Sequence, residues 1–207
     1  MTESTATLPG RDVSRETAEK LRRFEALIRK WNPVINLVSR TTIEDLRTRH
    51  FLDSTQIFDL APAGAKHWVD LGSGGGFPGL IVAILAADER PDLSVTLIES
   101  DQRKAAFLTT AARELGISPR VITERIETVA PIGADVLSAR ALAPLDTLLS
   151  FAERHLAPGG TAIFPKGANH QAELEQALEH WRFSYQKVPS KTDAAGVILI
   201  IGGISRV

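Results

Sequence analysis

The spacing of hydrophobic residues changes once along the chain. Before residue 60, apolar side chains recur at near-helical intervals between Val13 and Trp31, which predicts an amphipathic helix with Ser14 as its N-cap. A capping-box spacing that starts at Thr42 predicts a second helix over Ile43–Arg49. Residues 1–62 are therefore expected to form an N-terminal helical extension.

From His67 onward, short apolar runs alternate with helical segments, a pattern typical of βαβ units and a mostly parallel sheet. No helical segment separates the last two runs, so we expect them to pair as an antiparallel hairpin at the sheet edge. The predicted strands are His67–Leu71, Ser94–Glu99, Arg120–Thr123, Ala134–Ser138, Gly160–Pro165, Phe183–Val188 and Val197–Ile201, and the predicted helices are Pro78–Ala87, Asp101–Leu115, Pro144–His155 and His170–Trp181. Residues 63–207 thus predict one Rossmann-like α/β domain with seven strands.

A glycine-rich row follows the first predicted strand and leads into a helix. It reads Asp70-Leu-Gly-Ser-Gly-Gly-Gly-Phe-Pro-Gly79. Glycines let the backbone turn tightly and approach a ligand, and the following helix offers free N–H groups. Glu99 ends the second predicted strand, where its carboxylate can accept hydrogen bonds from both hydroxyls of a ribose. Loop and acid together predict a site for a nucleotide-like cofactor.

Two cofactor classes fit this row. Starting at Gly74, it satisfies the dinucleotide pattern G-x-G-x-x-G, so an NAD(P)-dependent oxidoreductase is one alternative. Starting at Asp70, it is Asp-x-Gly-x-Gly-x-Gly, which resembles the first motif of class I S-adenosylmethionine methyltransferases. A carboxylate at the strand end suits a cofactor with an ammonium and a sulfonium group, whereas it would repel a pyrophosphate. The charge therefore favours S-adenosylmethionine.

Composition narrows the chemistry further. The chain has 207 residues, 24 basic and 25 acidic, so nucleic-acid binding would need a local patch of positive charge. It has no cysteine, which excludes disulfides, thiolate metal sites and cysteine nucleophiles, and we expect no metal. The longest uncharged run, Leu71–Ala87, is too short and glycine-rich to span a membrane, and Met1–Gly10 lacks the pattern of a secretory signal. We expect a cytoplasmic, monomeric protein with no membrane partner.

Several short motifs occur in order between Trp31 and Lys166. They are Trp31-Asn32 with Asn36-Leu37, Arg49-His-Phe-Leu-Asp-Ser54, Asp70 to Gly79, Glu99-Ser-Asp-Gln-Arg-Lys104, Arg125-Ile-Glu127, Ser138-Ala-Arg-Ala141 and Lys166-Gly167. Together they resemble the RsmG (GidB) family of 16S rRNA guanine-N7 methyltransferases. The resemblance implies a class I methyltransferase fold, S-adenosylmethionine as cofactor, and methylation of N7 of a guanine in the 530 loop of the small ribosomal subunit.

The resemblance also implies site residues. The family's cofactor contacts fall on Gly72, Phe77, Ile126, Glu127 and Arg140, to which the glycine motif adds Asp70 and Gly74, and the ribose argument adds Glu99. No catalytic residue is assigned. Arg140, Lys166 and His50 are candidates for positioning the RNA.

The chain lacks the groups that other base methylations need. The segment Ser138–Pro144 stands where amino-methylating enzymes carry an Asn/Asp-Pro-Pro-aromatic row, and carbon-5 methylation needs a cysteine. Guanine N7 has an in-plane lone pair and no proton to lose, so transfer to it needs mainly positioning. Positioning leaves no characteristic nucleophile in the sequence, and a non-catalytic protein that binds S-adenosylmethionine or RNA stays an alternative.

Overall fold

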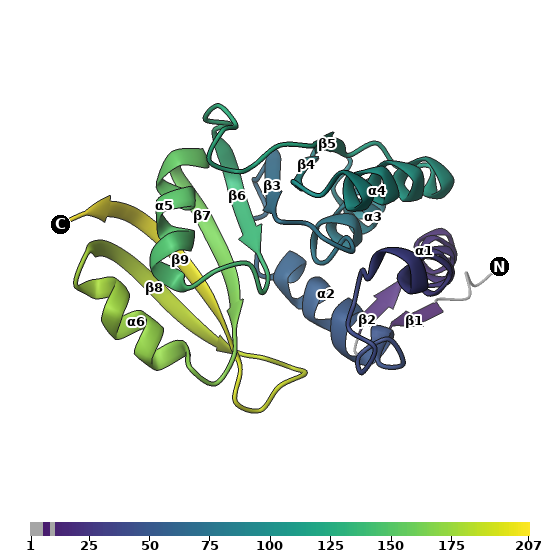
Figure 1. Ribbon diagram of the computed structural model, residues 1–207, viewed down its shortest axis with the longest axis horizontal. Helices are drawn as coiled ribbons and strands as arrows, with labels where there is room; N and C mark the ends of the chain where they lie inside the picture. The colour runs from purple at the N-terminus through teal and green to yellow at the C-terminus, as the bar shows by residue number, and fades with distance from the viewer. Residues whose placement is uncertain (1–5, 9–10) are drawn as a thin grey trace.

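The computed structural model describes residues 6–8 and 11–207, with side chains from residue 11 onward, and a seven-stranded sheet lies at its centre (Figure 1). The order across the sheet is β5 (Arg120–Ile122), β4 (Ser94–Ile98), β3 (His67–Leu71), β6 (Ala134–Ala139), β7 (Leu156–Lys166), β9 (Val197–Arg206) and β8 (Trp181–Pro189). The first five strands run parallel, and β9 is antiparallel to both β7 and β8. The predicted fold class is confirmed.

Helices cover both faces of this sheet. One layer contains α1 (Arg15–Ile35), the π-helix η1 (Leu46–Phe51), α2 (Leu52–Asp59), α3 (Gly79–Glu89) and α4 (Gln102–Leu115), and the other contains α5 (Leu145–His155) and α6 (His170–Leu178). Alternate strand residues serve the two layers: Trp68 packs in the first core and Val69 in the second. In the described part of the chain, no helix is long and apolar enough to cross a bilayer.

The first helix agrees with its prediction, and its end explains one motif. The Ser14 hydroxyl accepts a hydrogen bond from the Thr17 N–H and caps α1. At the other end Asn36 adopts a left-handed conformation with φ of 55°, and the buried Asn32 amide oxygen accepts the Val38 N–H at 2.8 Å. These two asparagines turn the chain from α1 toward η1.

The predicted helix Ile43–Arg49 is wrong. Residues 41–45 form turns, and the π-helix η1 begins only at Leu46. The Thr42 hydroxyl donates to the Ser39 carbonyl at 3.3 Å, and η1 has no side-chain cap, so the capping box does not form. The hairpin of β1 (Ala6–Leu8) and β2 (Arg11–Val13) was not predicted either.

Two further predicted boundaries shift at the C-terminal end. The strand β7 starts at Leu156, ahead of a bulge that contains Gly159 with φ of 79°. The helix α6 ends at Leu178, and Trp181 belongs to β8 instead. The Trp181 ring is buried, and its indole N–H donates to Asp146 Oδ1 at 3.0 Å, which fixes it in the second core.

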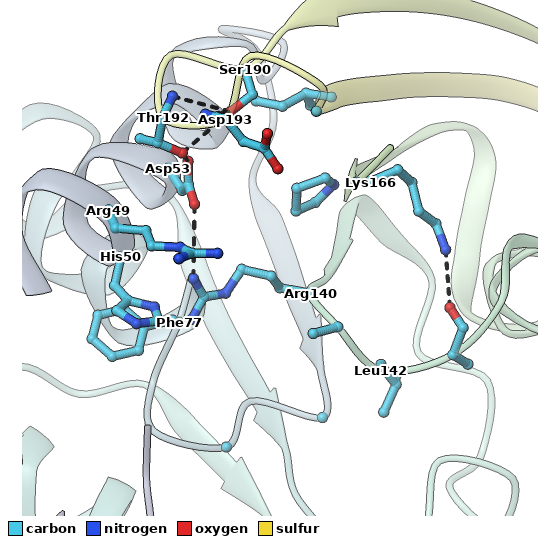
Figure 2. A pocket seen from close by; sticks show the side chains of 18 of the residues that line it. Arg49, His50, Asp53, Phe77, Arg140, Leu142, Lys166, Ser190, Thr192 and Asp193 are labelled. Atoms are coloured by element: carbon cyan, nitrogen blue, oxygen red, sulfur yellow. Dashed lines mark hydrogen bonds and ion pairs between the residues drawn. The ribbon is translucent and has the colours of Figure 1, made fainter. Parts of the chain in front are cut away.

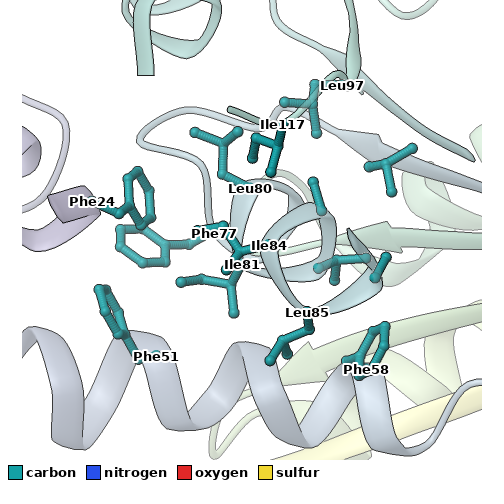
Figure 3. Close-up of a cluster of buried hydrophobic side chains, with 14 of the residues drawn as sticks. Phe24, Phe51, Phe58, Phe77, Leu80, Ile81, Ile84, Leu85, Leu97 and Ile117 are labelled. Carbon is teal, nitrogen blue, oxygen red and sulfur yellow. The ribbon is translucent and has the colours of Figure 1, made fainter. Parts of the chain in front are cut away.

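An aromatic cluster joins the N-terminal helices to the sheet (Figure 3). The Phe77 ring, which follows β3, lies 5.5 Å from the Phe24 ring of α1 and 5.8 Å from the Phe51 ring of η1, measured between centroids. The core is thus continuous across the predicted division between residues 62 and 63, which falls in the turns after α2 and stays a prediction. This packing brings η1 against the glycine loop.

Candidate functional site

The glycine loop leaves β3 through backbone conformations that favour glycine. Gly72 and Gly74 have φ angles of 62° and 53°. At Gly79, the first residue of α3, a Cβ atom would lie 2.6 Å from Asp70 Oδ2 and 2.4 Å from Leu97 Cδ2. The absence of a side chain at Gly79 therefore lets α3 begin directly against the sheet.

Asp70 lies beneath this loop and is fully buried. Its Oδ1 accepts the Ser138 hydroxyl at 2.7 Å, and its Oδ2 accepts the Gly79 N–H at 3.2 Å. Burial raises the pKa of Asp70 to about 6, against the opposing effect of these hydrogen bonds. Asp70 lines neither cavity of the site and holds the loop from below through its hydrogen bond with Gly79, and its predicted cofactor contact stays a prediction.

A cavity of about 420 Å³ opens above the carboxyl ends of β3, β4 and β5. It brings together six predicted cofactor residues: Gly72, Gly74, Glu99, Ile126, Glu127 and Arg140. The Glu99 carboxylate accepts the N–H groups of Gly74 and Asp101, each at 2.8 Å. A carboxylate has about four acceptor positions, so Glu99 is held in place and can accept hydrogen bonds from a ligand as well.

A second cavity of about 1020 Å³ adjoins the first (Figure 2). Its wall is formed by Arg49, His50 and Asp53 from η1 and α2, together with Phe77 and Arg140. Both cavities are lined by Gly72, Gly74, Lys104, Arg140, Ala141, Leu142 and Ala143. A ligand in the smaller cavity therefore lies beside the contents of the larger one.

Phe77 and His50 stack at the floor of the larger cavity. Their ring centroids lie 5.0 Å apart, and the Arg140 guanidinium carbon lies 5.2 Å from the Phe77 centroid. Phe77 lines the larger of the two cavities and not the smaller, and its predicted cofactor contact stays a prediction. Both ring nitrogens of His50 are buried and have no hydrogen-bond partner among residues 11–207. Burial, helped by Arg140 and Arg49, lowers the pKa of His50 to about 4, so the imidazole is neutral near pH 7.

Arg140 projects from the loop after β6, where Ala141 adopts a φ of 51°. Its Nη1 lies 4.0 Å from Asp53 Oδ2, and within the described chain its guanidinium donates no hydrogen bond. The Thr192 hydroxyl donates to Asp53 Oδ1, and burial raises the pKa of Asp53. A partly buried cation and a carboxylate thus line the same cavity with hydrogen-bonding capacity to spare, beside the enclosed imidazole of His50.

Lys166 has a different environment from the one expected of an RNA-binding cation. Its ammonium group donates to the Ala143 carbonyl at 3.0 Å and to Glu173 Oε2 at 2.6 Å. The same Glu173 oxygen accepts the Leu145 N–H at 2.7 Å. Lys166 is largely buried and ties the loop after β6 to α6, and its role in positioning the RNA stays a prediction.

The sequence did not predict that the loop between β8 and β9 belongs to the site. It folds back over the larger cavity and is held by α2: the Gln56 side chain donates to the Pro189 carbonyl at 2.8 Å and accepts the Lys191 N–H at 3.0 Å. Thr192 of this loop binds Asp53 (Figure 2). The segment gave only turn signals, and no local pattern reveals a contact with residues more than a hundred positions away.

Comparisons with known proteins agree with this geometry. The model of the family "rRNA small subunit methyltransferase G" matches residues 17–196. A protein named ribosomal RNA small subunit methyltransferase G from Ruegeria sp. strain TM1040 is 59% identical over 95% of this chain and 95% of its own. The protein of that name from Ruegeria pomeroyi is also 59% identical, over 95% of this chain and 96% of its own. A TehB-like SAM-dependent methyltransferase from Corynebacterium glutamicum shares the fold, with a TM-score of 0.58, 15% identity, and coverage of 87% of this chain and 98% of the other.

Proposed function

The chain belongs to the rRNA small subunit methyltransferase G family, and from this premise we propose that it methylates N7 of a guanine in the 530 loop of 16S rRNA, with S-adenosylmethionine as methyl donor. The observation that carries the proposal is the shared wall of the two cavities at Gly72, Leu142 and Arg140. One cavity has the size and lining for a nucleoside cofactor, and the adjoining one has room for an RNA base.

The smaller cavity fits the cofactor. Gly72 and Gly74 expose their backbone, Glu99 offers carboxylate acceptors for a ribose, and Ile126 supplies an apolar wall beside Glu127. S-adenosylmethionine, when bound, supplies a methyl group carried on a positively charged sulfur. The family match leaves the NAD(P)-dependent alternative without support.

The residues of the larger cavity suit a reaction that needs no base. His50 is neutral, and the side chains of Arg140 and Arg49 form no hydrogen bond within the described chain, so both cations can meet phosphate or base oxygens of RNA. Because guanine N7 already holds a lone pair, these side chains need only hold the base and exclude water.

The proposal is tested by incubating the protein with labelled S-adenosylmethionine and small ribosomal subunits that lack the modification. We expect label in the rRNA at a single guanine of the 530 loop. Borohydride reduction followed by aniline should then cleave the rRNA at that guanine, because an N7 methyl group labilises the base. A label found on a ribose, an exocyclic amine or a pyrimidine carbon would overturn the N7 assignment, and no label at all would overturn the activity.

The pH dependence gives a second measurement of the same proposal. No proton leaves guanine when N7 is methylated, so the single-turnover rate should stay nearly flat between mildly acidic and alkaline pH. A tenfold rise for each pH unit would indicate a general base and contradict the proposed reaction.

A further inference from the structure

The larger cavity contains one carboxylate that the contacts within the protein do not use fully. Three acidic side chains line it in the described chain. Glu173 binds Lys166 and the Leu145 N–H, and Asp193 is exposed at the rim. Asp53 is largely buried, and its Oδ2 accepts no hydrogen bond from the described residues, although Arg140 Nη1 lies 4.0 Å away.

The proposed reaction limits how the base can be recognised. Proteins commonly read guanine through O6 and N7, but N7 must stay uncovered if it is to receive the methyl group. The remaining edge is the Watson–Crick edge, with two donors, N1–H and the 2-amino group, and one acceptor, O6. A carboxylate can accept both donors together, whereas adenine places an acceptor at N1 and would be repelled.

We propose that Asp53 reads the Watson–Crick edge of the target guanine and makes the enzyme specific for it. The inference rests on the function proposed above. Oδ2 points toward Arg140 at the cavity wall, and Thr192 holds Oδ1 from the β8–β9 loop, so the orientation of the carboxylate is set before RNA binds. Arg140 lies beside Asp53 in the same wall, and within the described chain its guanidinium donates no hydrogen bond, so it can donate to O6.

An alternative role for Asp53 is to orient Arg140 without touching the base. Inosine separates the two roles, because it keeps N7, O6 and N1–H and lacks only the 2-amino group. An orienting role predicts that a change at Asp53 slows transfer to guanosine and to inosine by the same factor. A reading role predicts that it slows transfer to guanosine more.

The experiment uses small subunits reconstituted with unmethylated 16S rRNA that carries guanosine or inosine at the target position. We expect the wild-type protein to prefer guanosine by about tenfold, the size of one hydrogen bond to a charged group. In Asp53→Asn and Asp53→Ala the preference should fall to less than about threefold. Asp193→Asn, the matched control in the same cavity, should keep the full preference.

Each outcome decides between the possibilities. Equal slowing of both substrates in Asp53→Asn, or a wild-type protein indifferent to inosine, overturns the inference while leaving the methyltransferase function intact. Absence of transfer to guanosine by the wild-type protein overturns the proposed function instead. Calorimetry with S-adenosylhomocysteine checks that the variants are folded and bind the cofactor product as the wild type does. Should Asp53→Asn fail this check, Thr192→Val, which keeps the carboxylate but releases Oδ1, must reduce the preference, and an unchanged preference refutes the inference.

Discussion

The two sides of the site differ in how their polar groups are satisfied. Beneath the glycine loop, Asp70 and Glu99 each accept two hydrogen bonds from the protein itself. Across the cavity, the ring nitrogens of His50 have no hydrogen-bond partner among the described residues, and Arg140 has a long ion pair with Asp53 and a contact with the Phe77 ring. The carboxylates of the first side are held by the fold, whereas the polar groups of the second side have few partners within the protein.

This difference has an energetic meaning. A buried polar group without a partner costs about 1–3 kcal/mol of stability. Proteins keep such groups where function needs them, so residues on the two sides should respond oppositely to substitution. On the loop side substitution should cost stability, and on the η1 side it should cost activity.

The largest effect is expected at His50, in the dependence of stability on pH. Its pKa is lowered from 6.5 to about 4 on folding, so its contribution to stability is present above pH 6.5 and is lost as the pH falls toward 4. Asp70 has the opposite sign, because its raised pKa makes folding more favourable as the pH falls below about 6. In His50→Gln, the free energy of unfolding that is lost between pH 7 and pH 4 should be smaller by about 3 kcal/mol, at roughly 1.4 kcal/mol per pH unit.

Urea unfolding at pH 7 and pH 4 measures this change. His170→Gln is the control, because the His170 ring at the start of α6 bonds the Gly167 carbonyl and not a carboxylate. If the free energy of unfolding falls equally between pH 7 and pH 4 in the wild type and in His50→Gln, His50 is not the group responsible for the acid sensitivity.

The next effect is at Arg140. Arg140→Met should lower the single-turnover rate of methyl transfer by about 100-fold, or about 2.7 kcal/mol, because it removes the cation shared by both cavities. The free energy of unfolding should change much less than the activation free energy, because relief of a desolvated cation offsets the loss of its long ion pair with Asp53. Arg182→Met, on the exposed face of β8, should change neither quantity. If the free energy of unfolding falls as much as the activation free energy rises, Arg140 acts mainly in stabilising the fold.

Lys166 should behave in the reverse way. Lys166→Met breaks a largely buried ion pair and leaves Glu173 with only the Leu145 N–H, so the free energy of unfolding should fall by about 2 kcal/mol. Transfer at saturating substrate should fall less than fivefold in the fraction that remains folded. Denaturant titration with Lys187→Met as an exposed control makes the measurement. If stability is unchanged and activity is lost, Lys166 acts in binding RNA and not in stabilising the fold.

The sequence predicts the loop side far better than the η1 side. Strand β3, the glycine row and Glu99 lie close together in sequence or at the ends of neighbouring strands, so local periodicity and strand order suffice to place them. The motif around His50 is equally visible as letters, but nothing local reveals a π-helix in place of a capped α-helix.

The contacts that the sequence did not predict join residues from different elements. The sequence gives no sign that Thr192 reaches Asp53 or that Glu173 neutralises Lys166, because both pairs form only when the β8–β9 loop and α6 dock on the completed sheet. A basic residue in a motif therefore does not by itself indicate RNA binding: Arg140 and Lys166 look alike in the sequence, but their surroundings differ.

The smallest effect should be at Glu99, where the two sides of the comparison meet. Its carboxylate anchors the N–H groups of Gly74 and Asp101 and is proposed to bind the cofactor's ribose as well. Glu99→Gln places an amide N–H₂ where one of these acceptors stood, so it should weaken binding of S-adenosylhomocysteine about tenfold, or about 1.4 kcal/mol. Loss of loop anchoring alone would weaken every nucleoside ligand equally, whereas loss of the ribose contact would not. Calorimetry with S-adenosylhomocysteine and its 2′-deoxy analogue separates the two causes, because the analogue lacks one hydroxyl that Glu99 would accept. We expect the wild-type protein to bind the analogue more weakly than S-adenosylhomocysteine, and Glu99→Gln to show a much smaller difference. An equal difference in both proteins would mean that Glu99 anchors the loop but does not bind the ribose.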